Sequence, residues 1–149
     1  MTPFNQQAAF MQACGQTTDT QNFDQAELYL KLIIEECNET EDAMSFLRSH
    51  MLSNLLSIDA QHQMIADVAD GAIDTIYVCL GLLHSLGLDP QPLWDEVQRS
   101  NMSKAIPVEN GDGTVTMAVK RREDGKILKP ATFSHPNLLD IVKARYAGF

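Results

Sequence analysis

The chain has 149 residues and a formal net charge of −9, from 11 Lys and Arg against 20 Asp and Glu. This acidic balance argues against binding to nucleic acid, whose phosphates require a basic surface. No apolar run approaches the roughly 18–20 residues of a membrane span, and the N-terminus has no secretory signal pattern, so we expect a cytoplasmic protein with no membrane partner.

Glycine and proline predict where the helices begin and end, because both disfavour helix interiors. Residues 16–70 contain neither. In chain order we expect helices over about 4–14, 23–53 and 60–86, the first closed by Gly15 and the third by Gly87. A fourth helix is expected from Asp89-Pro90 to about Lys104, since Asp is a good N-cap and Pro suits the first helical position.

The residues after Pro107 show a pattern typical of strands and turns. Residues 114–119 resemble a short strand, and Glu123-Asp124-Gly125 is a turn before residues 126–129, which predicts a small hairpin. A last helix is expected from Asn137 to about Tyr146. The predicted fold is therefore all-α, a single domain over residues 1–149 in which a four-helix core precedes a short irregular or hairpin-containing segment and a final helix.

Charge is divided unevenly along the chain. Residues 1–98 hold two basic residues, Lys31 and Arg48, against 15 acidic ones, whereas residues 99–149 hold nine basic and five acidic residues. An acidic body that binds a metal ion and a basic tail that binds phosphate would explain this division. On charge alone, a solvated acidic surface with an unrelated basic tail is the favoured alternative.

One group of carboxylates lies on the apolar side of the second predicted helix. Glu35, Glu36 and Glu39 fall within one arc of about 100° that continues into the apolar stripe, whereas solvated acids should oppose that stripe. Burying an unpaired carboxylate costs several kcal/mol. With so few basic residues in this half of the chain, something else must neutralise these acids.

A second acidic row follows in Asp67, Asp70 and Asp74, which span about 60° of the third predicted helix. Because the row continues into a segment that is apolar all round, we expect at least Asp74 to be semi-buried. An apolar stripe roughly opposite the aspartates supports the simpler interpretation of an amphipathic helix, in which Asp67 is solvated.

If the second and third helices pack together, both rows can face one cavity. A ligand set made only of oxygen atoms suits a hard cation, Mg²⁺ or Mn²⁺. Di-iron helical proteins are a competing class, but they use Glu-x-x-His pairs, and no His here has Glu three residues before it. His62 does follow Asp59 at that spacing, so this alternative is weak but stays open.

These residues resemble the motifs of the all-α nucleoside triphosphate pyrophosphohydrolases, the superfamily of MazG-like and phosphoribosyl-ATP pyrophosphohydrolase-like proteins. Residues 35–39 match its E-E-x-x-E motif, and further matches follow in order at residues 74–81, 96–104 and 124–130. The chain looks most like the compact phage and bacterial members that include MazG-like dUTP pyrophosphatases.

The resemblance implies a four-helix core, a homodimer or homotetramer, and Mg²⁺-dependent cleavage of a nucleoside triphosphate, with a dNTP preferred, to the monophosphate and pyrophosphate. It implies metal ligands and catalytic groups on the two acidic helices and nucleotide or phosphate contacts in the tail. The implied metal ligands are Glu35, Glu36, Glu39, Asp70 and Asp74, with Glu35 and Glu36 also catalytic; the implied nucleotide contacts are Asn101, Lys104, Lys126 and Lys129.

The sequence departs from the family pattern at one position. The second motif is normally E-x-x-D, and Gly71 stands where its Glu belongs, so Asp70 would have to replace that ligand. Two other functions therefore stay open: a non-catalytic helical protein that binds nucleotide or a partner, and a true phosphoribosyl-ATP pyrophosphohydrolase.

Overall fold

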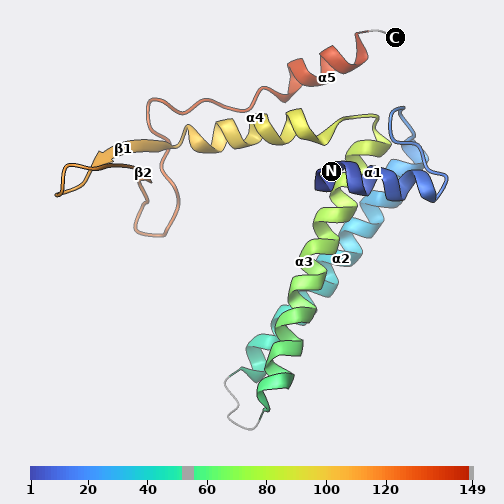
Figure 1. Cartoon of the computed structure of the whole chain (residues 1–149), viewed down its shortest axis with the longest axis horizontal. Helices are drawn as coiled ribbons and strands as arrows, with labels where there is room; N and C mark the ends of the chain where they lie inside the picture. Colours follow the sequence, from blue (N-terminus) through green and yellow to red (C-terminus); the bar gives the residue numbers. More distant parts are fainter. Residues whose placement is uncertain (52–55, 148–149) are drawn as a thin grey trace. The chain divides into compact units, whose positions relative to one another are not determined.

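Residues 1–51 and 56–147 are described in the computed structural model of the chain. They form two compact units, residues 1–90 and 91–149. The elements are α1 (Pro3–Ala13), α2 (Phe23–His50), α3 (Ile58–Ser85), α4 (Pro90–Met102), β1 (Ala105–Glu109), β2 (Val115–Val119) and α5 (Leu138–Tyr146) (Figure 1). The predicted helical fold with a C-terminal hairpin and a final helix is confirmed. None of the helices in the described residues combines the length and apolarity needed to cross a bilayer.

Local sequence signals account for the helix ends. The side chains of Thr2, Asn22 and Ser57 accept hydrogen bonds from the first turns of α1, α2 and α3. Gly15 and Gly87 follow α1 and α3 with φ of 73° and 68°, which glycine adopts at little cost. The second helix, predicted over 23–53, ends at His50, and residues 52–53 of that prediction lie outside the described residues.

In the first unit, α2 and α3 run side by side (Figure 1), and the side chains in their contact seam recur every seven residues. On α3 these are the buried residues Met64, Gly71, Val78 and Ser85. On α2 they are Tyr29, Glu36, Ala43 and His50, with Ile33, Thr40 and Leu47 between them, all at least partly buried. Met11 of α1 packs with Tyr29 and Val78 to complete the small core.

Two glycines of α3 let the helices approach closely. A Cβ added at Gly81 would lie 2.1 Å from Cε1 of the Tyr29 ring, and one added at Gly71 would lie 2.6 Å from Oγ1 of Thr40. No other residue type fits without movement of these neighbours. These contacts place Tyr29 against Gly81 and Thr40 against Gly71, and so define the antiparallel register of α2 and α3.

Hydrogen bonds fasten the connection between α1 and α2 to the end of α3. The side-chain amide of Gln25, a buried residue, donates to the Thr17 carbonyl and to Ser85 Oγ, both at 2.8 Å. The backbone N–H of Asn22 donates to the Ser85 carbonyl, also at 2.8 Å. These bonds satisfy polar groups that packing would otherwise leave without a hydrogen-bond partner, and they hold the start of α2 beside the end of α3.

The second unit contains an antiparallel hairpin in which Ala105 pairs with Val119 and Glu109 with Val115. The predicted strand at residues 114–119 is confirmed as β2. Its main partner was predicted wrongly, because β2 pairs with β1, while residues 126–129 contribute a single bridge, Arg121 to Ile127. Pro107 concealed β1 in the sequence, yet proline is tolerated in an edge strand, where one side of the backbone needs no partner.

Candidate functional site

The helix register places Glu36 opposite the second acidic row. Since Thr40 contacts Gly71 and the helices are antiparallel, Glu36, one turn before Thr40, lies across from Asp74 and Thr75, one turn after Gly71. Thr40 also donates a hydrogen bond from Oγ1 to the Glu36 carbonyl at 2.7 Å. Glu36 is therefore a carboxylate in the seam between two helices, which is the environment that the apolar stripe predicted.

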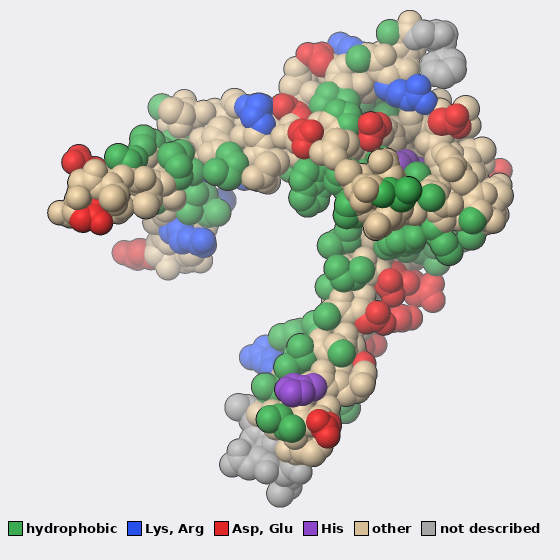
Figure 2. Space-filling view, viewed as in Figure 1, with side chains coloured by type: hydrophobic (Ala, Val, Ile, Leu, Met, Phe, Trp, Pro, Cys, Tyr) green, Lys and Arg blue, Asp and Glu red, His purple; other side chains and the backbone are tan. Residues whose placement is uncertain are grey.

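Electrostatics show that the five implied metal ligands are neighbours. The pKa of Glu36 is raised, first by burial and then by the negative charges of Asp74, Glu39, Glu35 and Asp70, in decreasing order. Figure 2 shows acidic side chains gathered along one side of the α2 and α3 pair. The structure thus brings Asp70 and Asp74 of the second predicted row near Glu35, Glu36 and Glu39 of the first.

The degree of burial differs from one expectation. Glu36 is partly buried, but Glu35, Glu39, Asp70 and Asp74 are exposed, so the prediction that Asp74 is semi-buried is wrong. The apolar segment after Asp74 packs against Tyr29 and against Met11 of α1, whereas Asp74 itself lies outside this core. Asp67 is also exposed and accepts a hydrogen bond from Gln63 at 2.8 Å, which fits its interpretation as a solvated residue.

Among the described residues, none of the five implied metal ligands takes part in an ion pair with a basic side chain. The ion pairs of Arg99 with Glu96 and of Arg122 with Asp124 lie in the second unit. Within residues 1–51 and 56–147, no group of three His, Cys, Asp or Glu side chains stands close enough together to hold a metal ion. To bind a cation here, the carboxylate groups would have to move closer together.

The structure explains why glycine stands at position 71, where the family's second motif has Glu. Its missing Cβ leaves room for Thr40, whose Oγ1, Cα and Cβ would lie 2.6, 3.3 and 3.3 Å from an added methyl group. A glutamate here would collide with Thr40 or separate the helices. Asp70, the neighbouring acid, is among the carboxylates whose charge raises the pKa of Glu36.

The implied nucleotide contacts lie in the second unit, and the structure divides them. Lys104 and Lys129 line a cavity of about 350 Å³, together with Lys120 and the apolar residues Ile106, Leu128, Pro130 and Ala131. Asn101 and Lys126 are exposed and are not among the lining residues, although Asn101 Oδ1 accepts a hydrogen bond from Lys104 Nζ at 2.7 Å. Lys120 could not be identified from the sequence, because it is the pairing of Ala105 with Val119 that brings it to the same end of the hairpin as Lys104.

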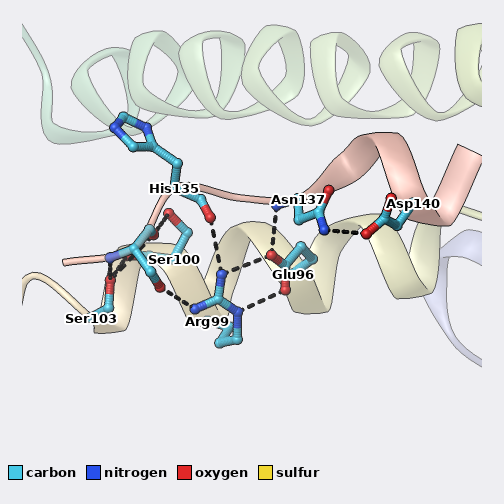
Figure 3. Close-up of polar contacts among 8 residues, drawn as sticks. Glu96, Arg99, Ser100, Ser103, His135, Asn137 and Asp140 are labelled. Carbon is cyan, nitrogen blue, oxygen red and sulfur yellow. Dashed lines mark hydrogen bonds and ion pairs between the residues drawn. The ribbon is translucent and has the colours of Figure 1, made fainter. Parts of the chain in front are cut away.

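Polar side chains of α4, with Ser103 just after it, hold the segment that follows the cavity-lining residues 128–131. Glu96, Arg99, Ser100 and Ser103 recur at helical spacing and bond to residues 132–137 (Figure 3). The two oxygens of Glu96 accept from Arg99 Nε and Nη2 at 2.7 Å, and one also accepts from the Asn137 backbone N–H at 2.7 Å. These donors lower the pKa of Glu96 to about 2.

Most of the chain up to the end of α4 matches a known protein family. Residues 11–101, more than half of the chain, match the family described as phosphoribosyl-ATP pyrophosphohydrolase. The matched range includes all five acids of the α2 and α3 face and ends at Asn101, before β1. None of the curated proteins matches the chain.

Proposed function

The chain belongs to the phosphoribosyl-ATP pyrophosphohydrolase family, and from this premise we propose that it hydrolyses a nucleoside triphosphate to the monophosphate and pyrophosphate with the help of Mg²⁺. The family name supports a pyrophosphohydrolase that acts on a nucleotide. Deoxynucleoside triphosphates are our first candidate substrates, because the tail at residues 124–130 resembles the dUTP-cleaving branch.

The single observation that carries this proposal is the unneutralised acidic face around Glu36. Five carboxylates on two helices share one surface, and one of them lies in the helix seam with a raised pKa. Such an arrangement costs stability and is typical of functional sites. A divalent cation offsets that cost.

The residues fit Mg²⁺ or Mn²⁺ because every candidate donor is a carboxylate oxygen, the ligand that hard cations prefer. Glu36, Glu39, Asp70 and Asp74 would hold the metal. When bound, Mg²⁺ supplies charge neutralisation of the triphosphate and a lower pKa for a water molecule. The chain itself contributes placement, because α2 and α3 fix the starting points of these side chains.

Glu35 is our candidate for the group that removes a proton from the attacking water. Its alternative role is that of a further metal ligand. It is exposed and belongs to the set of acids that raises the pKa of Glu36. Burial and the neighbouring carboxylates raise the pKa of Glu36, so a bound cation would favour its ionised form. Metal binding and ionisation of this site are therefore coupled.

We also propose that the protein acts as a homodimer or homotetramer in the cytoplasm. Large apolar side chains of α2 and α3 are exposed, including Ile34 at 57%, Ile73 at 61% and Ile76 at 53%. Burying them against a second copy would stabilise the pair and cover the sides of the acidic face. Light scattering on the purified protein tests this, since a monomer at micromolar concentration contradicts it.

The test of function is release of pyrophosphate from a panel of dNTPs, NTPs and phosphoribosyl-ATP, with and without Mg²⁺. We expect pyrophosphate from at least one dNTP only when Mg²⁺ is present. The variant Glu36→Gln should lose this turnover and keep its helical circular dichroism signal. Glu41→Gln, an exposed acid on α2 outside the proposed ligand set, is the matched control.

One observation favours a second candidate, a non-catalytic nucleotide-binding protein. Thr40 occupies the space in which the motif's usual Glu would stand at position 71. If Asp70 does not replace that ligand, nucleotide binds and no pyrophosphate appears. Release from phosphoribosyl-ATP alone would instead identify the activity that the family name describes.

A further inference from the structure

The hairpin of the second unit is a sheet of two strands, β1 and β2, in the described part of the chain (Figure 1). Its apolar side chains are largely exposed: Val115 is 64% exposed, Met117 58% and Val108 40%. A two-stranded sheet is marginally stable in water and gains stability when further strands extend it. The edges of this hairpin are therefore candidate binding surfaces.

The hydrogen bonds of the hairpin show which backbone groups point outward. Opposed residues of an antiparallel pair alternate between hydrogen-bonded and non-hydrogen-bonded pairs. The Asn110 N–H donates to the Thr114 carbonyl at 2.7 Å. Counted from this pair, the register makes Val115, Met117 and Val119 members of non-hydrogen-bonded pairs. Their N–H and C=O groups therefore point away from β1, and among the described residues no other segment bonds to them.

The two edges of the hairpin differ in chemistry. On β1, Pro107 is the partner of Met117, and it has no N–H to offer to a further strand. Proline at an edge is a common protection against pairing with another chain. The edge of β2, residues 115–119, contains neither proline nor a charged residue. A further strand can therefore pair with β2, whereas β1 ends the sheet on its side.

We propose that β2 pairs edge to edge with β2 of a second copy of this chain, antiparallel and centred on Met117, to form a four-stranded sheet. In this register Met117 faces Met117 of the second copy, and Val115 faces Val119 of the second copy. All three residues have outward N–H and C=O groups, so each pair exchanges two hydrogen bonds. The inference concerns the second unit alone, and it rests neither on the proposed hydrolysis nor on the proposed contact through α2 and α3.

The symmetry of the strand supports a second copy as the partner. Val115, Met117 and Val119 lie on one face of the hairpin, because side chains two residues apart in a strand share a face. Their partners in β1 include Ala105 and Pro107, which extend this apolar face. A two-fold contact requires a surface that complements itself. The strand meets this requirement, because its apolar residues are placed symmetrically about Met117.

Charges at the two ends of β2 favour the antiparallel arrangement. The turn before the strand carries Asp112, and Lys120 and Arg121 follow the strand directly; all three are exposed. Antiparallel pairing brings the acidic turn of one copy to the basic end of the other. Parallel pairing would instead place like charges together, which costs free energy.

Disulfide cross-linking of the full chain tests the contact and its register. The background for this test replaces the native Cys14, Cys37 and Cys79 by serine. Met117→Cys should then give a covalent dimer with oxidised glutathione, since the Cα atoms of such a pair are about 5.5 Å apart, within the range of disulfides. Val108→Cys is the matched control, because Val108 is also an exposed apolar residue of the hairpin but lies on β1. It should stay monomeric on a non-reducing gel.

Sedimentation of the chain without cross-linking gives a second measurement. Met117→Lys removes an apolar pair and sets two positive charges opposite each other, so it should raise the dissociation constant of the pair at least about tenfold. Because Met117 is exposed in the single chain, this variant should keep its fold. Val108→Lys adds the same charge away from the β2 edge and should change the dissociation constant by less than about twofold.

Three results overturn the inference. The first is a wild-type chain that stays monomeric in sedimentation, which would leave the β2 edge to a strand of a different protein. The second is equal cross-linking of Met117→Cys and Val108→Cys, or none of either. The third is association that Met117→Lys leaves unchanged, as expected if the copies meet only through α2 and α3. The pyrophosphate assay is a separate readout, so failure of the proposed hydrolysis alters none of these results.

Discussion

Replacing Gly81 by alanine tests the helix contact on which the acidic face depends. The added methyl carbon would lie 2.1, 2.3 and 2.6 Å from Cε1, Cδ1 and Cζ of Tyr29, whereas carbon atoms in ordinary contact are about 3.5–4.0 Å apart. Tyr29 is only 5% exposed and its hydroxyl donates to Gln16 at 2.7 Å, so the ring cannot move aside freely.

The magnitude follows from three contributions. Overpacking costs about 1–3 kcal/mol, and displacing the Tyr29 hydroxyl from Gln16 costs about 1 kcal/mol. The higher helix propensity of alanine offsets about 1 kcal/mol. We therefore expect Gly81→Ala to lower the free energy of unfolding by about 1–3 kcal/mol, and a loss of 2 kcal/mol would lower Tm by roughly 4–8 °C.

Urea denaturation followed by circular dichroism measures this change. Gly111→Ala is the matched control, because no atom lies within 4 Å of its added Cβ, and it should shift stability by less than about 0.5 kcal/mol. In a Tyr29→Ala background the clash is gone, so Gly81→Ala should become stabilising. If Gly81→Ala is as stable as the wild type, α2 and α3 do not meet at Tyr29, and the register that sets Glu36 opposite Asp74 is refuted.

Three other predictions concern charged residues. Folding raises the pKa of Glu36, so without metal the contribution of this carboxyl to stability should fall as pH rises through its usual pKa. Urea titrations at several pH values should show that Glu36→Gln removes this contribution, and the same pH dependence in variant and wild type would contradict the raised pKa. The pKa of Glu96 is lowered to about 2, so the stability that this carboxylate contributes is present above its usual pKa and lost as pH falls towards 2. Carbon NMR of the Glu96 carboxyl should show this low pKa. The variant Arg99→Gln should raise the pKa of Glu96. Lys126→Ala should raise KM for nucleotide with kcat unchanged, and an unchanged KM would make this exposed lysine a surface residue only.

The sequence by itself determined most of the local structure and the composition of the acidic face. Gly15 and Gly87 marked two helix ends correctly, because glycine adopts the positive φ that follows a helix at little cost. Glu36 could be identified as a carboxylate within an apolar stripe, because the helical periodicity that defines the stripe can be read from residues close together in the sequence. The family match covers that same region.

Only the tertiary structure decided which segments meet. The pairing of β2 with β1, rather than with residues 126–129, joins strands through a proline that local patterns count as a break. That pairing sets Lys120 beside Lys104, and the approach of Thr40 to Gly71 sets Glu36 across from Asp74 while leaving Asp74 exposed. Such contacts depend on the shapes of surfaces far apart in the chain, which a periodic pattern along one segment does not contain.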